Sequence, residues 1–379
     1  MLQPSIWEKE TFYGHKDIII VGSGVVGLWS AYYMKRLQPN ANILILERGI
    51  IPTGASTRNA GFACIGSVTE LLSDARKMGE NKMLEIVALR YEGLRRIRKV
   101  FSKSEIDFER YGGYELINSQ QYPKLKQLKN DIGWLNITLR KAIKDEKTFR
   151  LADRKIKGFG FKQTSHLIES KGEAQLHSGK LVQALLRKVQ GMGVQVLTQA
   201  EVTGYEKIKG RVELQTSLPV SLSTDQLLIC TNGFARQLLP QLDVRPVRGQ
   251  VLVTSPIKKL PFKGAFHFEE GFYYFRNLGN RVLLGGARNK ALEAENSGDL
   301  VTTEFIQSEL EHFLKAVVLP KQHYTIEYRW SGIMGMGDEK LPVVKKIEKN
   351  IYCAVRMSGM GVALAPVVGE SIARQMLSK

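Results

Sequence analysis

The chain has 379 residues, of which 43% are hydrophobic and 24% are charged, a balance that excludes a disordered, collagen-like or disulfide-stapled protein. Its 55 Lys and Arg against 37 Asp and Glu give a net charge of +18, and its three cysteines are too few and scattered for a disulfide framework. This length fits two or three domains with a cleft, and we expect a reducing, cytoplasmic setting. The start, Met1–Lys16, lacks the apolar run of a signal peptide, and Ile18–Val21 is too short to span a membrane.

The first motif in chain order is a βαβ unit that ends at Glu47. A β-branched strand over 17–21 leads into Gly22-Ser23-Gly24-Val25-Val26-Gly27, a helix over 25–37 and a second strand over 43–46. Gly22 permits the tight turn, Gly24 admits a pyrophosphate to the backbone, and Gly27 allows close helix–strand packing. The helix N-terminus favours phosphate, and Glu47 is placed to accept hydrogen bonds from a ribose.

The loop after Glu47-Arg48 carries small residues and a hydroxyl pair, in the run Gly54-Ala-Ser-Thr-Arg-Asn-Ala-Gly61-Phe62. With this loop the chain resembles the D-amino-acid oxidase superfamily of FAD enzymes, on its glycine oxidase and sarcosine oxidase side. Further stretches carry the resemblance over essentially the whole chain: Glu173–Glu201, Leu227–Gly233, Arg245–Gln250, Trp330–Gly332 and Ser358–Pro366. A helix starting after Gly359 and Gly361 would also place a positive dipole end beside a reduced flavin.

The resemblance implies FAD as cofactor, held by residues from five regions. These are Gly22, Ser23, Gly24, Val25, Val26 and Gly27; Glu47, Arg48, Ser56, Thr57, Arg58, Asn59, Ala60 and Gly61; Val202; Thr231, Asn232 and Gly233; and Gly332, Gly359, Met360, Gly361 and Val362. Family members with covalent flavin use a cysteine near the Trp-x-Gly segment, and none lies between Trp330 and Lys340. We therefore expect noncovalent FAD.

The implied fold class is α/β (α+β), with a Rossmann-like FAD-binding domain interleaved with a substrate domain built on a mixed or antiparallel sheet. The FAD-binding domain is expected from 1–80, 166–240 and 330–379, and the substrate domain from 81–165 and 241–329. Periodicity in the latter predicts helices over 82–101 and 122–143, strands over 106–109, 114–117, 251–254, 271–276 and 281–285, and a helix over 305–317.

The expected substrate residues depart from the family pattern. Tyr273 falls where glycine oxidase-like members carry a tyrosine that contacts the substrate. Members that oxidise small amino acids hold the carboxylate with two arginines, but Met334 and Gly359 stand at those positions here, so a glycine oxidase activity is in doubt. Arg356 is a candidate replacement, and Arg276 and Arg288 are further candidates on the substrate sheet.

The flavin supplies the redox chemistry in this family, and no Ser-His-Asp order or metal-ligand spacing points to another mechanism. We expect hydride transfer from a small amine, amino acid or related substrate to FAD, with O₂ or another redox partner as electron acceptor. The positive charge leaves open two alternatives: oxidation of a modified tRNA nucleotide, or a 2-hydroxy acid dehydrogenase docked on an anionic membrane surface. Basic residues gather in 90–103 (six basic, one acidic) and 141–157 (seven basic, three acidic), but stacking motifs for RNA are absent.

Overall fold

The computed structural model describes residues 3–143 and 147–378, and the chain divides into two compact units. The first unit comprises 1–58, 178–247 and 333–379, and the second comprises 59–177 and 248–332. The expected boundaries at 80/81 and 165/166 differ most, since residues 59–80 and 166–177 fall in the second unit. The assignment of each unit to cofactor or substrate stays a prediction at this point.

The first unit is built on an eight-stranded sheet with the order β17-β18-β11-β1-β2-β8, to which β10 and β9 are added beside β11. Pairing of β18, β11, β1, β2 and β8 is parallel, and β17, β10 and β9 are antiparallel to their neighbours. The strands are β1 (Lys16–Val21), β2 (Ile43–Leu46), β8 (Gln195–Leu197), β9 (Val202–Ile208), β10 (Arg211–Thr216), β11 (Leu222–Ile229), β17 (Val343–Glu348) and β18 (Ile351–Val355). The apolar run of β1 is buried on both faces, as a central parallel strand requires.

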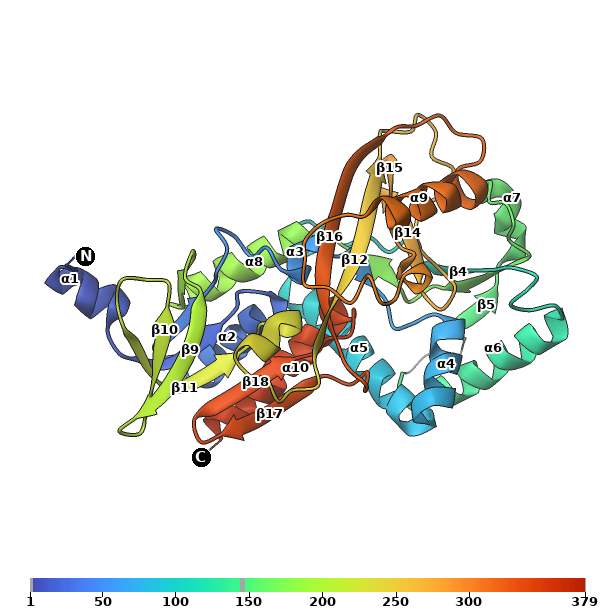
Figure 1. Cartoon of the computed structure of the whole chain (residues 1–379). Helices are drawn as coiled ribbons and strands as arrows, with labels where there is room; N and C mark the ends of the chain where they lie inside the picture. The colour runs from blue at the N-terminus through green and yellow to red at the C-terminus, as the bar shows by residue number, and fades with distance from the viewer. Residues whose placement is uncertain (1–2, 144–146, 379) are drawn as a thin grey trace. The chain divides into compact units, whose positions relative to one another are not determined.

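Two long helices of the first unit, α2 (Val25–Leu37) and α10 (Gly361–Leu377), pack against each other beside this sheet (Figure 1). Gly369 makes the close approach feasible, because a Cβ there would lie 2.8 Å from the main chain of Trp29. The predicted helix over 25–37 and strand over 43–46 are confirmed to the residue. The other helical segments of this unit are α1 (Ile6–Glu8), η1 (Lys9–Tyr13), α3 (Ala55–Arg58), α8 (Ser178–Gly191) and η3 (Asn232–Gln237).

The second unit contains most of another eight-stranded sheet, ordered β16-β12-β15-β14-β13-β4-β6-β5. From β12 to β5 its pairs are antiparallel except for the parallel pair of β13 with β4. Its strands are β4 (Gly113–Ile117), β5 (Phe149–Leu151), β6 (His166–Ser170), β12 (Arg245–Thr254), β13 (Ala265–Phe268), β14 (Tyr273–Leu278), β15 (Arg281–Gly286) and β16 (Ile326–Met336); β3 (Phe62–Ala63) pairs separately with β7 (Ala174–Gln175). The expected mixed sheet is confirmed.

Strand alternation gives this second sheet two different faces. One face carries an aromatic core that includes Phe266, Tyr273 and Phe275, and it is covered by Leu310 and Phe313 of a single helix. The opposite face presents a smaller cluster with Val251, Val253 and Leu283, on which Ala60, Phe62, Tyr274 and Trp330 pack. The loop that follows α3 in the chain therefore lies on the face of the sheet opposite to α9 (Glu304–Phe313).

The helices of the second unit follow the predicted periodicity closely. They are α4 (Val68–Met78), α5 (Glu80–Val100), α6 (Leu125–Leu139), η2 (Asp153–Lys155), α7 (Ile156–Phe159), η4 (Arg288–Lys290), α9 (Glu304–Phe313) and η5 (Leu314–Val318). The predicted strand over 106–109 is wrong: Glu109 forms only an isolated bridge with Gln175, and Asp107 has a φ of 46°, which breaks an extended run.

None of the helices in the described ranges combines the length and the apolar character needed to cross a bilayer. The basic run over 90–103 lies mainly on α5. The run over 141–157 includes residues 144–146, which lie outside the described ranges.

Candidate cofactor and substrate sites

The glycine-rich turn between β1 and α2 has the geometry that its sequence predicts. Gly22 has a φ of +102°, and a Cβ on Gly27 would lie 2.0 Å from the carbonyl oxygen of Gly22. A Cβ on Gly24 would lie 3.0 Å from Ser56 Oγ, and the Val25 N–H donates to that same hydroxyl at 2.9 Å. Glycine at these positions keeps side chains away from the N-terminus of a thirteen-residue helix, whose dipole favours an anion.

Glu47 lies at the end of β2, directly beside this turn. Its carboxylate accepts hydrogen bonds from the Ser23 N–H at 3.1 Å and the Ser23 hydroxyl at 2.6 Å, and its other oxygen accepts from the Gly49 N–H at 2.9 Å. The Ala200 N–H donates to the Glu47 carbonyl, which brings the chain leading into Val202 alongside. The acid and the start of β9 therefore stand together, as a site for a ribose and an attached base requires.

The loop predicted to run along the cofactor forms the short helix α3. Thr57 Oγ1 donates to the Pro52 carbonyl at 2.6 Å, and Arg58 Nε donates to the Thr53 carbonyl at 2.9 Å. Arg48 stacks on Phe234, with its guanidinium carbon 4.1 Å from the ring centroid. In the second unit, Asn59 Oδ1 accepts from the Gly61 N–H at 2.8 Å, and Gly61 has a φ of +73°.

Two further turns of the first unit lie side by side, one after β11 and one between β18 and α10. Asn232 Oδ1 accepts from the Met357 N–H at 3.2 Å, and a Cβ on Gly233 would lie 2.8 Å from the Met334 carbonyl oxygen. Three of the four residues from 356 to 359 have positive φ: Arg356 has a φ of 63°, Ser358 of 47° and Gly359 of 79°. The buried hydroxyls of Thr231 and Ser358 have no hydrogen-bond partner in the described parts of the chain.

The predicted cofactor residues fall into both units. Gly22–Gly27, Glu47, Arg48, Ser56–Arg58, Val202, Thr231–Gly233 and 359–362 belong to the first, and Asn59, Ala60, Gly61 and Gly332 belong to the second. Within the first unit the residues fit FAD: a glycine cradle at a helix N-terminus suits the pyrophosphate, and Glu47 suits the ribose. The orphaned hydroxyls of Thr231 and Ser358 near the start of α10 suit the polar edge of a flavin.

Arg356, the candidate substrate arginine, is engaged within the first unit. Its Nε donates to the Leu341 carbonyl at 3.0 Å, and its NH1 lies 2.7 Å from Asp243 Oδ2. The side chain is 8% exposed, and Glu339 lies 3.8 Å from NH2. The guanidinium is thus already neutralised by two carboxylates, which leaves little charge to attract an anionic ligand.

Met334 and Gly359, the two positions where the resemblance leads us to expect arginines, lie side by side. A Cβ on Gly359 would be 3.4 Å from Met334 Sδ. The first unit therefore has a thioether at position 334 and no side chain at position 359, so neither position supplies a guanidinium.

Tyr273 and Tyr274 point to opposite faces of the second sheet. Tyr273 is 4% exposed and packs on Phe313 with ring centroids 4.7 Å apart, beneath α9. Tyr274 lies over Gly285 and meets Phe62 edge-on at 5.9 Å, on the face that carries Ala60. Burial raises the pKa of Tyr274 to about 12. The geometry therefore favours Tyr274 over the predicted Tyr273 as a residue that a ligand on this face could reach.

Arg276 shares that face with Tyr274, two residues along β14. Opposite it stand Ala265 of β13 and Leu283 of β15. Arg276 is 5% exposed, and burial lowers its pKa to about 10. Arg288, just past β15, stacks on Phe272 at 5.0 Å, and burial lowers its pKa as well.

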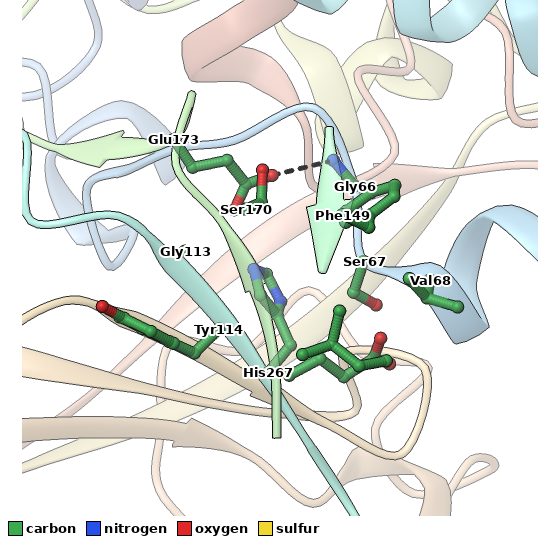
Figure 2. A pocket seen from close by; sticks show the side chains of 11 residues that line it. Gly66, Ser67, Val68, Gly113, Tyr114, Phe149, Ser170, Glu173 and His267 are labelled. Carbon is green, nitrogen blue, oxygen red and sulfur yellow. Dashed lines mark hydrogen bonds between the residues drawn. The ribbon is translucent and has the colours of Figure 1, made fainter. Parts of the chain in front are cut away.

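A narrow buried pocket lies further along the same sheet face, between the strands and the start of α4 (Figure 2). Glu115 accepts from the Thr69 N–H at 3.2 Å, and Glu173 accepts from the Ile65 N–H at 3.0 Å. Burial raises the pKa of each carboxyl to about 7. Ser170 Oγ and His267 Nε2 line the pocket without a hydrogen-bond partner among the described residues, and the space admits about one water molecule.

These pocket residues are absent from the sequence-based site, although Glu115 offered a signal. It is an acid inside Gly113–Ile117, a strand that is apolar on both sides of it and buried throughout. Such an acid needs internal donors, and the sequence does not show that they come from residues 65–69.

Among the described residues, no three His, Cys, Asp or Glu side chains are arranged to hold a metal ion. The three cysteines are buried and unpaired. Burial raises the pKa of Cys64 to about 12 and that of Cys353 to about 11, which makes them poor nucleophiles.

Comparisons with known proteins agree with these features over the length of the chain. A family model described as "DAO: FAD dependent oxidoreductase" matches residues 17–375. A probable oxidoreductase OrdL from Haemophilus influenzae is 22% identical over 96% of this chain and 83% of its own, and the sarcosine oxidase subunit beta of Rhizobium meliloti is 24% identical over 96% and 85%.

Solved structures show the same fold at low sequence identity. An L-proline dehydrogenase from P. horikoshii superposes with a TM-score of 0.76 at 17% identity, covering 97% of this chain and 94% of its own. A glycine oxidase from Geobacillus kaustophilus superposes with a TM-score of 0.73 at 18% identity, covering 96% and 95%.

Proposed function

The chain belongs to the DAO family of FAD-dependent oxidoreductases, and on that premise we propose that it oxidises a small amine or amino acid. The observation that carries the proposal is the face of the second sheet opposite to α9, where Tyr274 and Phe62 meet beside Ala60 of the predicted flavin loop. The relatives named as sarcosine oxidase, glycine oxidase and L-proline dehydrogenase support a donor with a carbon–nitrogen bond.

When it is bound, the cofactor accepts the hydride. The residues of the chain bind the cofactor and orient the substrate. The turn Gly22–Gly27 and the N-terminus of α2 would hold the pyrophosphate, and Glu47 the ribose. The N-terminus of α10, a helix of seventeen residues, would stabilise negative charge that develops on a reduced flavin. Phe62, Tyr274 and Trp330 would exclude water and position the donor carbon.

The electron acceptor in this proposal is O₂ or another redox partner, and the compartment is the cytoplasm. Three unpaired cysteines, Cys64, Cys230 and Cys353, support a reducing compartment.

Anaerobic reduction of the flavin tests the proposal directly. The purified holoenzyme is mixed, without oxygen, with amines, amino acids and 2-hydroxy acids in turn, and the loss of the oxidised flavin absorbance is followed. We expect bleaching by at least one amine or amino acid, whatever the physiological acceptor is. Bleaching by 2-hydroxy acids alone would overturn the proposed donor class.

A second proposal concerns the excess charge: α6 makes a peripheral contact with an anionic membrane surface. Trp134 is 39% and Ile137 is 66% exposed, and their spacing of three places both on the outer side of the helix. Exposed Lys126 and Arg140 flank them, and Lys141, which pairs with Glu80 at 2.8 Å, follows Arg140. Exposed aromatic and aliphatic side chains bordered by lysine and arginine are typical of helices that lie in the headgroup region.

Vesicle sedimentation tests this contact. We expect binding to phosphatidylglycerol-containing vesicles, release at high salt, and weak binding to pure phosphatidylcholine. The double variant Trp134→Ser, Ile137→Ser should bind less, and Trp7→Ser, which removes a 74% exposed tryptophan elsewhere, should bind as the wild type does. Retention on immobilised tRNA without vesicle binding would favour a nucleic-acid partner instead and overturn the membrane proposal.

A further inference from the structure

Arg276 is a buried cation for which the chain supplies no acceptor. It is 5% exposed, and its Nε is fully buried without a hydrogen-bond partner. Neither an ion pair nor a hydrogen bond joins its guanidinium to any residue in 3–143 or 147–378. A buried guanidinium without a hydrogen-bond acceptor is costly because it loses hydration, and the field of Glu109 offsets only part of that loss.

Two other buried arginines show how the same chain treats a cation that has a structural role. Arg90 NH1 lies 2.9 Å from Glu70 Oε1, and Arg248 NH2 lies 2.8 Å from Glu295 Oε1. Both are paired inside the second unit, the unit that also holds Arg276. The missing partner at Arg276 is therefore a local feature of this position.

Glu109 is the acid that acts electrostatically on Arg276, and both of its carboxylate oxygens already accept hydrogen bonds from other residues. Glu109 Oε2 accepts from Gln175 Nε2 at 2.9 Å, and its Oε1 accepts from the Tyr111 hydroxyl at 3.1 Å. Gln175 Nε2 also contacts the carbonyl of Asn277, the residue after Arg276, at 3.2 Å, while its Oε1 is buried and unpartnered in the described structure. The unsatisfied donor, Arg276 Nε, and the unsatisfied acceptor, Gln175 Oε1, thus belong to segments that contact each other at Asn277.

The position of Arg276 in the sheet directs it to the proposed substrate face. Strand alternation puts it on the same side as Tyr274, and the strand partner of Tyr274 on β13 is His267. Phe62 meets both of these rings edge-on, His267 at 5.1 Å and Tyr274 at 5.9 Å. The orphaned cation therefore shares the face on which a donor molecule is expected.

We infer that Arg276 binds a carboxylate of the substrate and replaces the arginines that are missing at Met334 and Gly359. This assignment rests on the proposed amine or amino acid oxidation and names a carboxylate-bearing donor as its substrate class. A planar guanidinium matches a carboxylate in two parallel hydrogen bonds, and the low-dielectric surroundings strengthen that pairing. A carboxylate of the bound substrate would be the acceptor that the chain itself does not supply to Arg276, which explains why this charge is buried without a protein partner.

Binding of simple carboxylates, followed through the flavin absorbance of the oxidised holoenzyme, tests the role of Arg276 without turnover. Acetate and benzoate are titrated into wild type, Arg276→Met and Arg276→Lys, with acetamide and benzamide as neutral counterparts. We expect Arg276→Met to weaken carboxylate binding by at least about ten-fold and amide binding hardly at all. Arg276→Lys should lie between, because it keeps the charge and loses the paired hydrogen bonds.

Arg281→Met is the matched control, since Arg281 on the neighbouring strand already pairs with Glu327 and its loss should leave carboxylate binding unchanged. Unaltered carboxylate binding in Arg276→Met and Arg276→Lys would overturn the assignment. Loss of carboxylate binding in Arg356→Met instead would move the site to Arg356, and loss of FAD from Arg276→Met and Arg276→Lys would make Arg276 a cofactor residue. Absence of flavin bleaching by any amine or amino acid would count against the proposed function alone, because the titration needs no substrate oxidation.

Discussion

At the scale of single residues, the three glycines of the first turn answer to different constraints. Gly22 needs a positive φ, whereas Gly27 needs space, because a Cβ would meet the Gly22 carbonyl oxygen at 2.0 Å. That obstacle is main chain, so no side-chain rotation relieves it.

Gly27→Ala should therefore lower both stability and cofactor content. We expect a loss of about 1–3 kcal/mol in the free energy of unfolding from overpacking, and a smaller flavin-to-protein ratio after purification. Gly133→Ala is the matched control: a Cβ there has open space in the middle of α6, so it should raise stability by up to about 1 kcal/mol. Equal flavin content in wild type and Gly27→Ala would contradict the role of this turn.

Of the two neighbouring tyrosines of β14, Tyr273 packs in the core under α9 and Tyr274 lies on the proposed substrate face. Tyr274→Phe should lower kcat/KM for the substrate about two- to ten-fold through loss of one hydroxyl contact, as steady-state kinetics will measure. Tyr273→Phe, which alters the face under α9, should leave kcat/KM unchanged. The reverse pattern would restore the assignment expected from the sequence.

At the scale of elements, two buried carboxyls hold the segment that leads from the flavin loop into α4. Glu115 accepts from the Thr69 N–H near the start of α4, and Glu173 accepts from Ile65 and Gly66. Figure 2 shows Glu173 beside Gly66. Arg90 stabilises the anionic form of Glu173, but burial outweighs it and raises the pKa. The sheet thus holds this segment through two carboxyl groups that titrate near neutral pH.

The raised pKa values predict a stability that falls as pH rises. From pH 4.5 to about 7 the folded state binds more protons than the unfolded state, so the unfolding free energy should drop by up to about 1.4 kcal/mol per pH unit for each carboxyl. Above about pH 7 their contribution is constant. Glu115→Gln mimics the protonated form, so urea titrations over this range should show a shallower slope; a slope identical to that of wild type would exclude Glu115 as a source.

At the scale of the whole molecule, the flavin is expected to be held without a covalent bond. The three cysteines are buried, and burial raises their pKa values. Precipitation of the holoenzyme with acid should leave the yellow chromophore in the supernatant, where its absorbance is measured. A yellow pellet that keeps its colour after washing would show a covalent link.

The net charge of +18 has no single explanation at this scale. The basic residues instead include two groups, one buried and paired and the other exposed. Arg90 and Arg248 are buried and paired, and they hold the second unit together. The cations of α6 are on the surface, where charge acts on partners and remains sensitive to salt. Composition alone does not distinguish these two populations.

The sequence by itself determined the family, the cofactor and the first βαβ unit. Gly22, Gly24, Gly27 and Glu47 lie within one short stretch, and local steric and hydrogen-bonding requirements dictate their types. Helical periodicity likewise identified α5, which buries one face, and the short apolar run identified β2, which is buried at every position.

Only the tertiary structure decided which polar residues share a surface. A one-residue shift along β14 moves a side chain to the other face, so sequence could not separate Tyr273 from Tyr274. The partner of a buried charge is contributed by a distant segment: Asp243 is 113 positions from Arg356, whereas Arg276 has no acceptor among the described residues. Side-chain type is local, but pairing and burial depend on long-range packing, and that packing decides which arginine is free to bind an anion.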